Sequence, residues 1–217
     1  MDLFSTILPN KQEISKDAYL LKGFALVYEP ALFADLAVIL KQAPLRQMMT
    51  KMGFSLSASM TNCGALGWVS DRSGYRYDAL DSLTNQPWPA MPVSFKQLAE
   101  SAAIAAGFKN FQPDVCLINQ YKVGAGMGLH QDKNELDFSQ PIISVSLGIP
   151  AVFLFGGLQR NDKTMKLQLY HGDVVVWGGE SRLKFHGIMP LKAPVTLKVV
   201  HPVLDTARIN LTFRKAG

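Results

Sequence analysis

The stretch LHQDKNE, residues 129–135, places a histidine and an aspartate two positions apart. Side chains at positions i and i+2 of a β-strand point to the same face. His130 and Asp132 would therefore offer an imidazole nitrogen and a carboxylate oxygen to one metal ion. On this pair alone, a surface turn with polar side chains is the favoured alternative. The choice between a turn and a metal site therefore depends on other residues of the chain.

The chain contains three other histidines that could complete a metal site. His186 lies in the strand-like run RLKFHGIMP, before a glycine turn, and is the candidate for the third ligand. His171, in YHGD, is expected to be a turn residue, and His201 lies in VVHPV. Two histidines and one carboxylate fill three positions of an octahedral ion, which is typical of non-haem Fe(II) oxygenases. A structural zinc site is more often closed by four protein ligands.

The run ARINLTFR near the C-terminus carries a second chemical pattern. Alternation places four polar side chains on one strand face: Arg208, Asn210, Thr212 and Arg214. Two arginines on one face repel each other unless an anion lies between them, and the planar guanidinium suits a carboxylate. On this pattern alone a solvated strand face is favoured, but beside a metal triad a dicarboxylate becomes the expected anion. Asn119 and Tyr121, also two apart, would share one side of another strand.

Periodicity predicts the elements that must position these residues. Residues 30–44 and 92–108 predict two helices, the first with Pro30 in its first turn and the second closed by Gly107. Strands are expected around 20–27 and over 54–64, and an aromatic loop over 67–92. From CLINQYKVG onward, short strand-like runs follow at near-regular spacing, with TLKVV and ARINLTFRKAG the last two. Such a series suggests a sandwich or barrel of the jelly-roll type, with two helices outside it.

Composition bounds the class of protein. With 217 residues, 48% of them hydrophobic, the chain can bury one sizeable core. Its two cysteines have no CxxC spacing, which suits a reducing compartment, and the net charge of +5 is compatible with nucleic acid. No basic segment precedes the short apolar stretch at the N-terminus, and no run approaches the roughly 18 apolar residues of a membrane span. We therefore expect no signal peptide, no membrane association and a cytoplasmic location.

Five longer motifs together strongly resemble the AlkB family of Fe(II)- and 2-oxoglutarate-dependent dioxygenases: FQPDVCLINQY, LHQDKNE, VSLGIPAVFLFGG, HGDVVVWGGESRLKFHGI and RINLTFR. The similarity runs almost end to end and includes LRQMMT and SMTNCGALGW. It implies an α+β protein with a double-stranded β-helix (jelly-roll) core and flanking helices. Residues 1–217 would form a single dioxygenase domain. About 1–110 would be an N-terminal extension with a nucleotide-recognition lid, and about 111–217 the catalytic core.

The resemblance also implies roles for individual residues. The catalytic Fe(II) ligands would be His130, Asp132 and His186. The 2-oxoglutarate positions would be Asn119, Tyr121, Arg208, Asn210 and Arg214, with Arg208 at the distal carboxylate and Arg214 near the chelating one. The substrate positions would be Thr50, Met60, Trp68, Tyr75, Tyr77, Asn134 and Arg160. By composition alone the aromatic residues of this set would be partly buried loop residues, but aromatic rings also stack on unpaired bases.

The implied reaction is oxidative demethylation of 1-methyladenine and 3-methylcytosine, a direct reversal of DNA alkylation damage. It consumes 2-oxoglutarate and O2 and releases succinate, CO2 and formaldehyde. Single-stranded DNA is the expected partner, with double-stranded DNA and RNA as further candidates, and a monomer is expected. One alternative is the same chemistry on RNA or a protein side chain. Another is a non-catalytic nucleic-acid-binding jelly roll.

Two positions depart from the family pattern. Asn134 stands where an acid would face the positive charge of a methylated base, so discrimination in favour of cationic lesions should be weaker. The neighbouring Glu135 would point the other way if this segment were a strand. Phe54 stands where a lid tyrosine is expected, which removes a hydroxyl that could touch DNA phosphate. Neither departure affects the implied iron or 2-oxoglutarate residues.

Overall fold

The computed structural model describes residues 10–193, 201–204 and 206–217. The predicted strand TLKVV, at 196–200, lies outside these residues. So does most of the N-terminal stretch on which the absence of a signal peptide was predicted. Within the described residues, neither α-helix is both long and apolar enough to cross a membrane.

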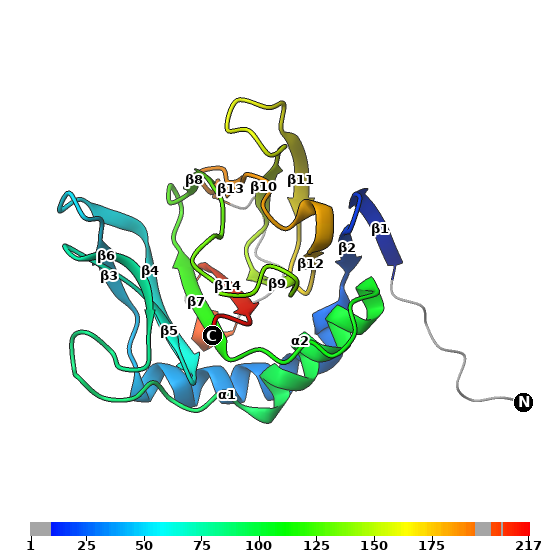
Figure 1. Cartoon of the computed structure of the whole chain (residues 1–217). Helices are drawn as coiled ribbons and strands as arrows, with labels where there is room; N and C mark the ends of the chain where they lie inside the picture. The colour runs from blue at the N-terminus through cyan, green and yellow to red at the C-terminus, as the bar shows by residue number, and fades with distance from the viewer. Residues whose placement is uncertain (1–9, 194–200, 205) are drawn as a thin grey trace, which may run out of the picture.

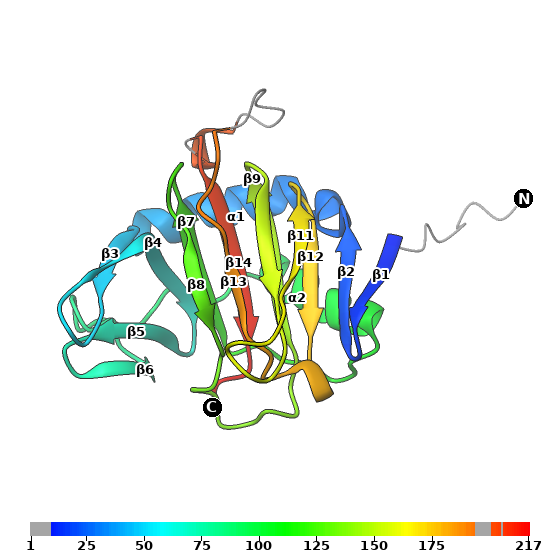
Figure 2. The same ribbon diagram turned by 90° about the horizontal axis from the view of Figure 1, so that it is seen from above.

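Two antiparallel sheets face each other and form the β core. The larger sheet has the order β1 (Asn10–Ser15), β2 (Ala18–Lys22), β12 (Val174–Trp177), β9 (Ile142–Gly148), β14 (Arg208–Arg214), β7 (Val115–Tyr121), β4 (Ser55–Gly64) and β3 (Arg46–Met49). The smaller sheet has the order β11 (Met165–Leu169), β10 (Ala151–Phe155), β13 (His186–Ile188) and β8 (Met127–His130). Seen from above, the smaller sheet lies over the middle of the larger one (Figure 2). The jelly-roll prediction is confirmed.

Two helices cover the other face of the larger sheet (Figure 1). They are α1 (Glu29–Gln42) and α2 (Val93–Ala106), as predicted from periodicity. Pro30 lies in the first turn of α1, and Gly107 ends α2 in the left-handed conformation with φ 103°. The helices therefore bury one face of the sheet and leave the other for the smaller sheet and the site.

The alternation along β14 divides its side chains between two apolar layers. Ile209, Leu211 and Phe213 pack with the helices, where Phe213 meets Phe95 of α2 edge-on. The opposite face of the larger sheet packs against the smaller sheet through side chains such as Phe153 and Trp177. All seven residues of β14 are buried, so the solvated strand face favoured by the local pattern is wrong.

Two local predictions also differ from the structure. The strand expected around 20–27 ends at Lys22, because Gly23 takes a left-handed conformation (φ 64°) and a 3-10 helix, η1 (Phe24–Tyr28), follows. The expected aromatic loop contains a hairpin of β5 (Gly67–Asp71) and β6 (Gly74–Asp78). Its turn is closed by the Asp71 carboxylate, which accepts a hydrogen bond from the Ser73 amide, and by Gly74 at φ 108°.

Candidate metal centre and active site

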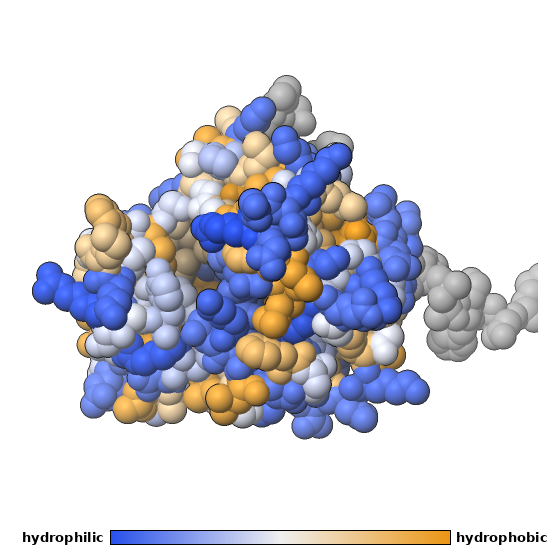
Figure 3. Space-filling view, turned by 45° about the horizontal axis from the view of Figure 1, so that its top comes forward, coloured by the Kyte–Doolittle hydropathy of each residue, from blue (hydrophilic) through white to orange (hydrophobic). Residues whose placement is uncertain are grey.

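A cavity of about 500 Å³ lies between the two sheets and the β5–β6 hairpin. The surface is hollowed beside the lobe that carries β3 to β6 (Figure 3). The walls carry polar side chains from β7, β8, β13 and β14, and apolar side chains such as Leu56 and Met60 from β4. The cavity therefore combines charged groups with an apolar wall and opens to solvent.

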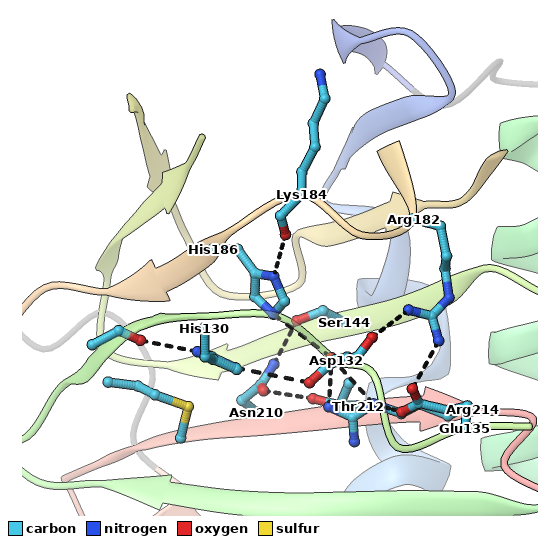
Figure 4. Close-up of polar contacts among 12 residues, drawn as sticks. His130, Asp132, Glu135, Ser144, Arg182, Lys184, His186, Asn210, Thr212 and Arg214 are labelled. Atoms are coloured by element: carbon cyan, nitrogen blue, oxygen red, sulfur yellow. Dashed lines mark hydrogen bonds and ion pairs between the residues drawn. The ribbon is translucent and has the colours of Figure 1, made fainter. Parts of the chain in front are cut away.

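His130, Asp132 and His186 come together in this cavity (Figure 4). His130 and His186 face each other across the β8–β13 pair, with ring centroids 4.4 Å apart. Asp132 Oδ1 lies 3.8 Å from His130 Nε2, and Asp132 Oδ2 lies 3.6 Å from His186 Nε2. Candidate ligand atoms of the three residues all lie within 4.8 Å of one another, and no other such group occurs among the described residues.

The spacing of His130 and Asp132 predicted that both lie on one strand. This prediction is wrong for Asp132, which reaches its position in another way. Strand β8 ends at His130, and Asp132 lies in the loop that follows. Arg214 holds its carboxylate, and Arg182 Nη1 donates a hydrogen bond to its backbone carbonyl at 2.8 Å. The carboxylate is therefore placed by two arginines from distant parts of the chain.

Both histidines present the same nitrogen to the centre. His130 Nδ1 lies 2.9 Å from the Gly128 carbonyl, and His186 Nδ1 lies 3.1 Å from the Lys184 carbonyl. A carbonyl can only accept, so each Nδ1 carries the proton and each Nε2 keeps its lone pair for a metal. Burial, and next the electrostatic effect of the neighbouring His186, lower the pKa of His130 to about 4. Burial opposes ionisation of Asp132, but Arg214 and the two histidines hold its pKa well below the ordinary value.

Arg208 supplies an unsatisfied cation at another part of the cavity wall. Its side chain is 1% exposed, and its Nη2 donates to Ser146 Oγ at 3.0 Å. Its Nε and Nη1 are buried with no hydrogen-bond partner among the described residues. Burial lowers the pKa of this guanidinium to about 10, partly countered by the Tyr121 phenol. A buried guanidinium with two unused donors fits a carboxylate that is not part of the chain.

The other predicted 2-oxoglutarate positions differ in how far the protein satisfies them. Asn119 Oδ1 and Arg214 Nη1 are buried without a partner among the described residues. Asn210, in contrast, donates to Ser144 Oγ and the Val145 carbonyl and accepts from Thr212 Oγ1, at 2.8–2.9 Å. Tyr121 is buried, with its hydroxyl 3.9 Å from Met127 Sδ. Asn119, Arg208 and Arg214 thus keep unused polar atoms at the cavity, whereas the Asn210 amide is fully used by the protein.

Most predicted substrate residues line the cavity. The rings of Trp68 and Tyr75 are stacked, with centroids 5.5 Å apart and planes 16° apart, on one face of the β5–β6 hairpin. Met60 is buried in the wall, while Asn134 and Arg160 lie in exposed segments of the rim. The stacked pair is half exposed at Tyr75, so a planar group can reach it from solvent.

Two of the predicted substrate residues do not line the cavity. Thr50 lies at the turn between β3 and β4, where its hydroxyl accepts a hydrogen bond from the Phe54 amide at 3.1 Å. Tyr77 points its hydroxyl to Glu135 Oε1 at 2.5 Å. Both side chains are therefore engaged by the protein itself.

Sequence reasoning missed Arg182 and misjudged Glu135. Because β8 has ended, Glu135 is not on a strand and instead turns inward, where it is 5% exposed. Arg182 Nη2 approaches Glu135 Oε2 at 3.1 Å, at an angle unlike that of a hydrogen bond, and Arg214 Nε approaches Oε1 at 3.4 Å. No spacing signal pointed to Arg182.

For His171 the turn prediction is confirmed, and its Nδ1 accepts a hydrogen bond from the Gly148 amide at 3.0 Å.

Comparisons with known proteins agree with this geometry. The family model of the 2OG-Fe(II) oxygenase superfamily matches residues 17–214. The chain is 52% identical to the alpha-ketoglutarate-dependent dioxygenase AlkB of Escherichia coli over 217 residues, which is 100% of this chain and 98% of that protein. It is 34% identical to the human nucleic acid dioxygenase ALKBH1, over 69% of this chain and 46% of that protein. The solved structure of OsALKBH1 is similar with a TM-score of 0.78 and 27% identity, covering 94% of this chain and 99% of that one.

Proposed function

The chain belongs to the AlkB family of the 2OG-Fe(II) oxygenase superfamily, and on that premise we propose how its cavity carries out the reaction. It is an Fe(II)- and 2-oxoglutarate-dependent dioxygenase that oxidatively demethylates alkylated DNA. One observation carries the assignment of residues. The His–Asp–His group, the unsatisfied Arg208 and the stacked Trp68–Tyr75 pair all line the same cavity.

His130, Asp132 and His186 are the proposed Fe(II) ligands. Support comes from their convergence within 4.8 Å, from the two free Nε2 lone pairs, and from the ionised state of the Asp132 carboxylate. Three protein ligands leave the remaining positions of an octahedral ion for cosubstrates. Iron with 2-oxoglutarate and O2 supplies the oxidation that removes the methyl group, with succinate, CO2 and formaldehyde as products.

The 2-oxoglutarate site is proposed at Asn119, Tyr121, Arg208, Asn210 and Arg214. Arg208 binds the distal carboxylate, because its Nε and Nη1 are buried donors that need an anionic acceptor. Arg214 lies beside Asp132 and is assigned to the carboxylate nearest the metal. Asn210 contributes indirectly, because its amide fixes Ser144 and Thr212 in the cavity wall.

The base is proposed to lie against the Trp68–Tyr75 stack, with Met60, Asn134 and Arg160 around it. We propose 1-methyladenine and 3-methylcytosine in single-stranded DNA as preferred substrates. Their methyl groups block base pairing, so less free energy is needed to extrude these bases. A base stacked on aromatic side chains contributes about 1–3 kcal/mol to affinity. Thr50 and Tyr77 are left with no direct contact to the base in this proposal.

The test is incubation of the purified protein with Fe(II), 2-oxoglutarate, O2 and single-stranded oligonucleotides carrying either lesion. We expect the oligonucleotide to lose the mass of one methyl group while formaldehyde and succinate accumulate. His130→Ala should abolish all three signals, whereas the matched control His201→Ala removes an imidazole that stacks on Phe33 outside the cavity and should keep them. Succinate without demethylation would move the substrate elsewhere, and RNA carrying the same lesions would be tested next. No succinate from folded, iron-loaded protein would overturn the proposal.

The remaining finer expectations concern location and assembly. The cytoplasmic location, the monomeric state and the boundary between lid and core near residue 110 stay predictions. Sedimentation of the protein with and without an oligonucleotide would measure its state of assembly.

A further inference from the structure

A chain of contacts joins the β5–β6 hairpin to the candidate metal ligand Asp132. The Tyr77 hydroxyl donates to Glu135 Oε1 at 2.5 Å, and the same oxygen lies 3.4 Å from Arg214 Nε. Arg214 Nη2 then donates to Asp132 Oδ2 at 2.8 Å. Figure 4 shows the Glu135, Arg214 and Asp132 carboxylate and guanidinium groups pointing toward one another. The path therefore runs from the element that carries Trp68 and Tyr75 to the metal site.

The charges along this path balance only as a set. Arg214 lies against the carboxylates of both Glu135 and Asp132. Arg182 lies against the Glu135 carboxylate and donates to the backbone carbonyl of Asp132. A buried ion is costly unless it is paired, so removal of one member strands the others. Against the effect of burial, the two acids and Tyr77 raise the pKa of Arg214. Burial raises the pKa of the Tyr77 phenol well above its ordinary value, so its hydroxyl stays protonated and donates.

Other contacts support the hairpin from β4 and from the segment after β6, away from the metal site. The Asn62 side chain pairs with the backbone of Trp68 at 3.0 Å in both directions, and Trp88 Nε1 donates to the Asp78 carbonyl at 3.0 Å. A two-stranded hairpin is marginal without such support. The Tyr77–Glu135 hydrogen bond, in contrast, reaches the loop that contains Asp132. Tyr77 and Tyr75 lie on the same hairpin face, two positions apart, so fixing one orients the other.

We propose that Tyr77 and Glu135 are positioning residues that hold the Trp68–Tyr75 platform in register with the Asp132 carboxylate, through Arg214. This inference rests on the proposed function, because it needs a base on the platform and a metal at Asp132. It replaces the predicted base contact of Tyr77 with a contact inside the protein. A misplaced methyl group would leave the oxidation of 2-oxoglutarate running without demethylation, since only the relative position of the two parts changes.

The experiment uses Tyr77→Phe, Glu135→Gln and the double variant of the full chain. Tyr77→Phe removes only the hydroxyl, and Glu135→Gln keeps the shape but removes the charge. Tyr170→Phe is the control, because it deletes the hydroxyl of a tyrosine that is 58% exposed and outside the cavity. Three measurements are made. The first is the affinity for Co(II), from its visible absorption with no nucleic acid present. The second gives kcat and KM for a 3-methylcytosine oligonucleotide, and the third gives the formaldehyde formed per succinate.

Glu135→Gln should weaken Co(II) binding about tenfold, as partners of metal ligands do. Tyr77→Phe should lower kcat and the formaldehyde-to-succinate ratio severalfold while KM for the oligonucleotide changes little. In the Glu135→Gln background the effect of Tyr77→Phe should at least halve, because both residues act along one path. Tyr170→Phe should match the unmodified protein in all three measurements.

Two results would overturn the inference. A raised KM with unchanged coupling, additive with Glu135→Gln, would make Tyr77 a base-contacting residue. Unchanged Co(II) affinity in Glu135→Gln would show that Glu135 does not position the metal ligand. If the unmodified protein forms succinate but demethylates no lesion, the substrate assignment fails instead, and the Co(II) affinities still decide whether the path acts on Asp132.

Discussion

Arg214 donates two hydrogen bonds to a single oxygen of Asp132, from Nε at 3.2 Å and from Nη2 at 2.8 Å, both to Oδ2. Oδ1 is thereby turned toward His130 and lies 3.8 Å from its Nε2, whereas Oδ2 also lies 3.6 Å from His186 Nε2. A carboxylate held in this way offers one oxygen to a metal while its other oxygen is neutralised by the guanidinium. Strand β14 thus orients the proposed metal ligand Asp132, which lies in the loop after β8.

The two arginines of β14 should respond in opposite ways to replacement by methionine. Arg208→Met removes a buried guanidinium with two unused donors, so the ligand-free protein should become more stable by about 1 kcal/mol. Its KM for 2-oxoglutarate should rise at least tenfold, because one hydrogen bond to a charged group contributes about 1.5–3 kcal/mol. Urea unfolding without ligand and succinate formation at varied 2-oxoglutarate measure the two effects.

Arg214→Met is the matched comparison on the same strand face. It leaves the Asp132 carboxylate without its guanidinium partner and Glu135 with Arg182 alone, so the free energy of unfolding should fall by about 3–5 kcal/mol. Equal loss of stability in both variants would mean that Arg208 is paired in the ligand-free protein.

The pKa of His130 makes the metal-free protein sensitive to acid. Burial lowers this pKa to about 4, from about 6.5 in an unfolded chain. Between these values the unfolded state binds more protons than the folded state. The contribution of neutral His130 to the free energy of unfolding is therefore fully present above pH 6.5 and is lost as the pH falls toward 4. About a third of the side chain is exposed, so we expect a loss of roughly 1–2 kcal/mol rather than the full value of the shift.

The measurement is urea unfolding of the metal-free protein at pH 7 and pH 4.5, compared with His130→Gln. The glutamine variant cannot titrate at this position, so its stability should fall less over the same interval. Identical pH profiles for the two proteins would show that His130 titrates near its ordinary value.

The sequence predicted those parts of the site that follow from regular backbone geometry. Alternation along β14 correctly separated Arg208 and Arg214 from Ile209 and Leu211, because a strand has a fixed period of two. The two helices could be predicted for the same kind of reason, since apolar spacing and terminal Pro and Gly mark their ends. These features depend only on residues close together in the chain.

The rest of the site depends on contacts between residues far apart in sequence. Asp132 is placed by Arg182 and Arg214, respectively 50 and 82 positions later in the chain. Glu135 was expected to point away because the strand period was extended past the end of β8. Periodicity cannot show where a short strand stops, nor which distant arginine pairs with a buried acid.

The Trp68–Tyr75 stack should contribute to nucleic acid binding and not to cosubstrate binding. Trp68→Ala removes one stacking ring, which is worth about 1–3 kcal/mol, so affinity for a lesion oligonucleotide should fall roughly 5- to 150-fold. Succinate formation without nucleic acid should keep its KM for 2-oxoglutarate. Fluorescence anisotropy of a labelled oligonucleotide measures the first quantity, and Trp68→Phe should restore much of the lost affinity. A similar loss of 2-oxoglutarate affinity would indicate that the hairpin supports the fold of the whole cavity.

Asn134 gives the sharpest test of substrate preference in this chain, because the resemblance to the family implies an acid at this position. The residue is exposed at the rim of the cavity, so a charge placed there acts through partly screened solvent. Asn134→Asp should raise kcat/KM for cationic 3-methylcytosine about 1.4- to fivefold, since exposed opposite charges contribute about 0.2–1 kcal/mol. Neutral 3-methylthymine should gain nothing, and the gain for 3-methylcytosine should shrink as salt is added. Competition between the two lesions at two salt concentrations measures the ratio directly. An equal gain for both lesions would mean that the introduced carboxylate improves the cavity without reading the charge of the base.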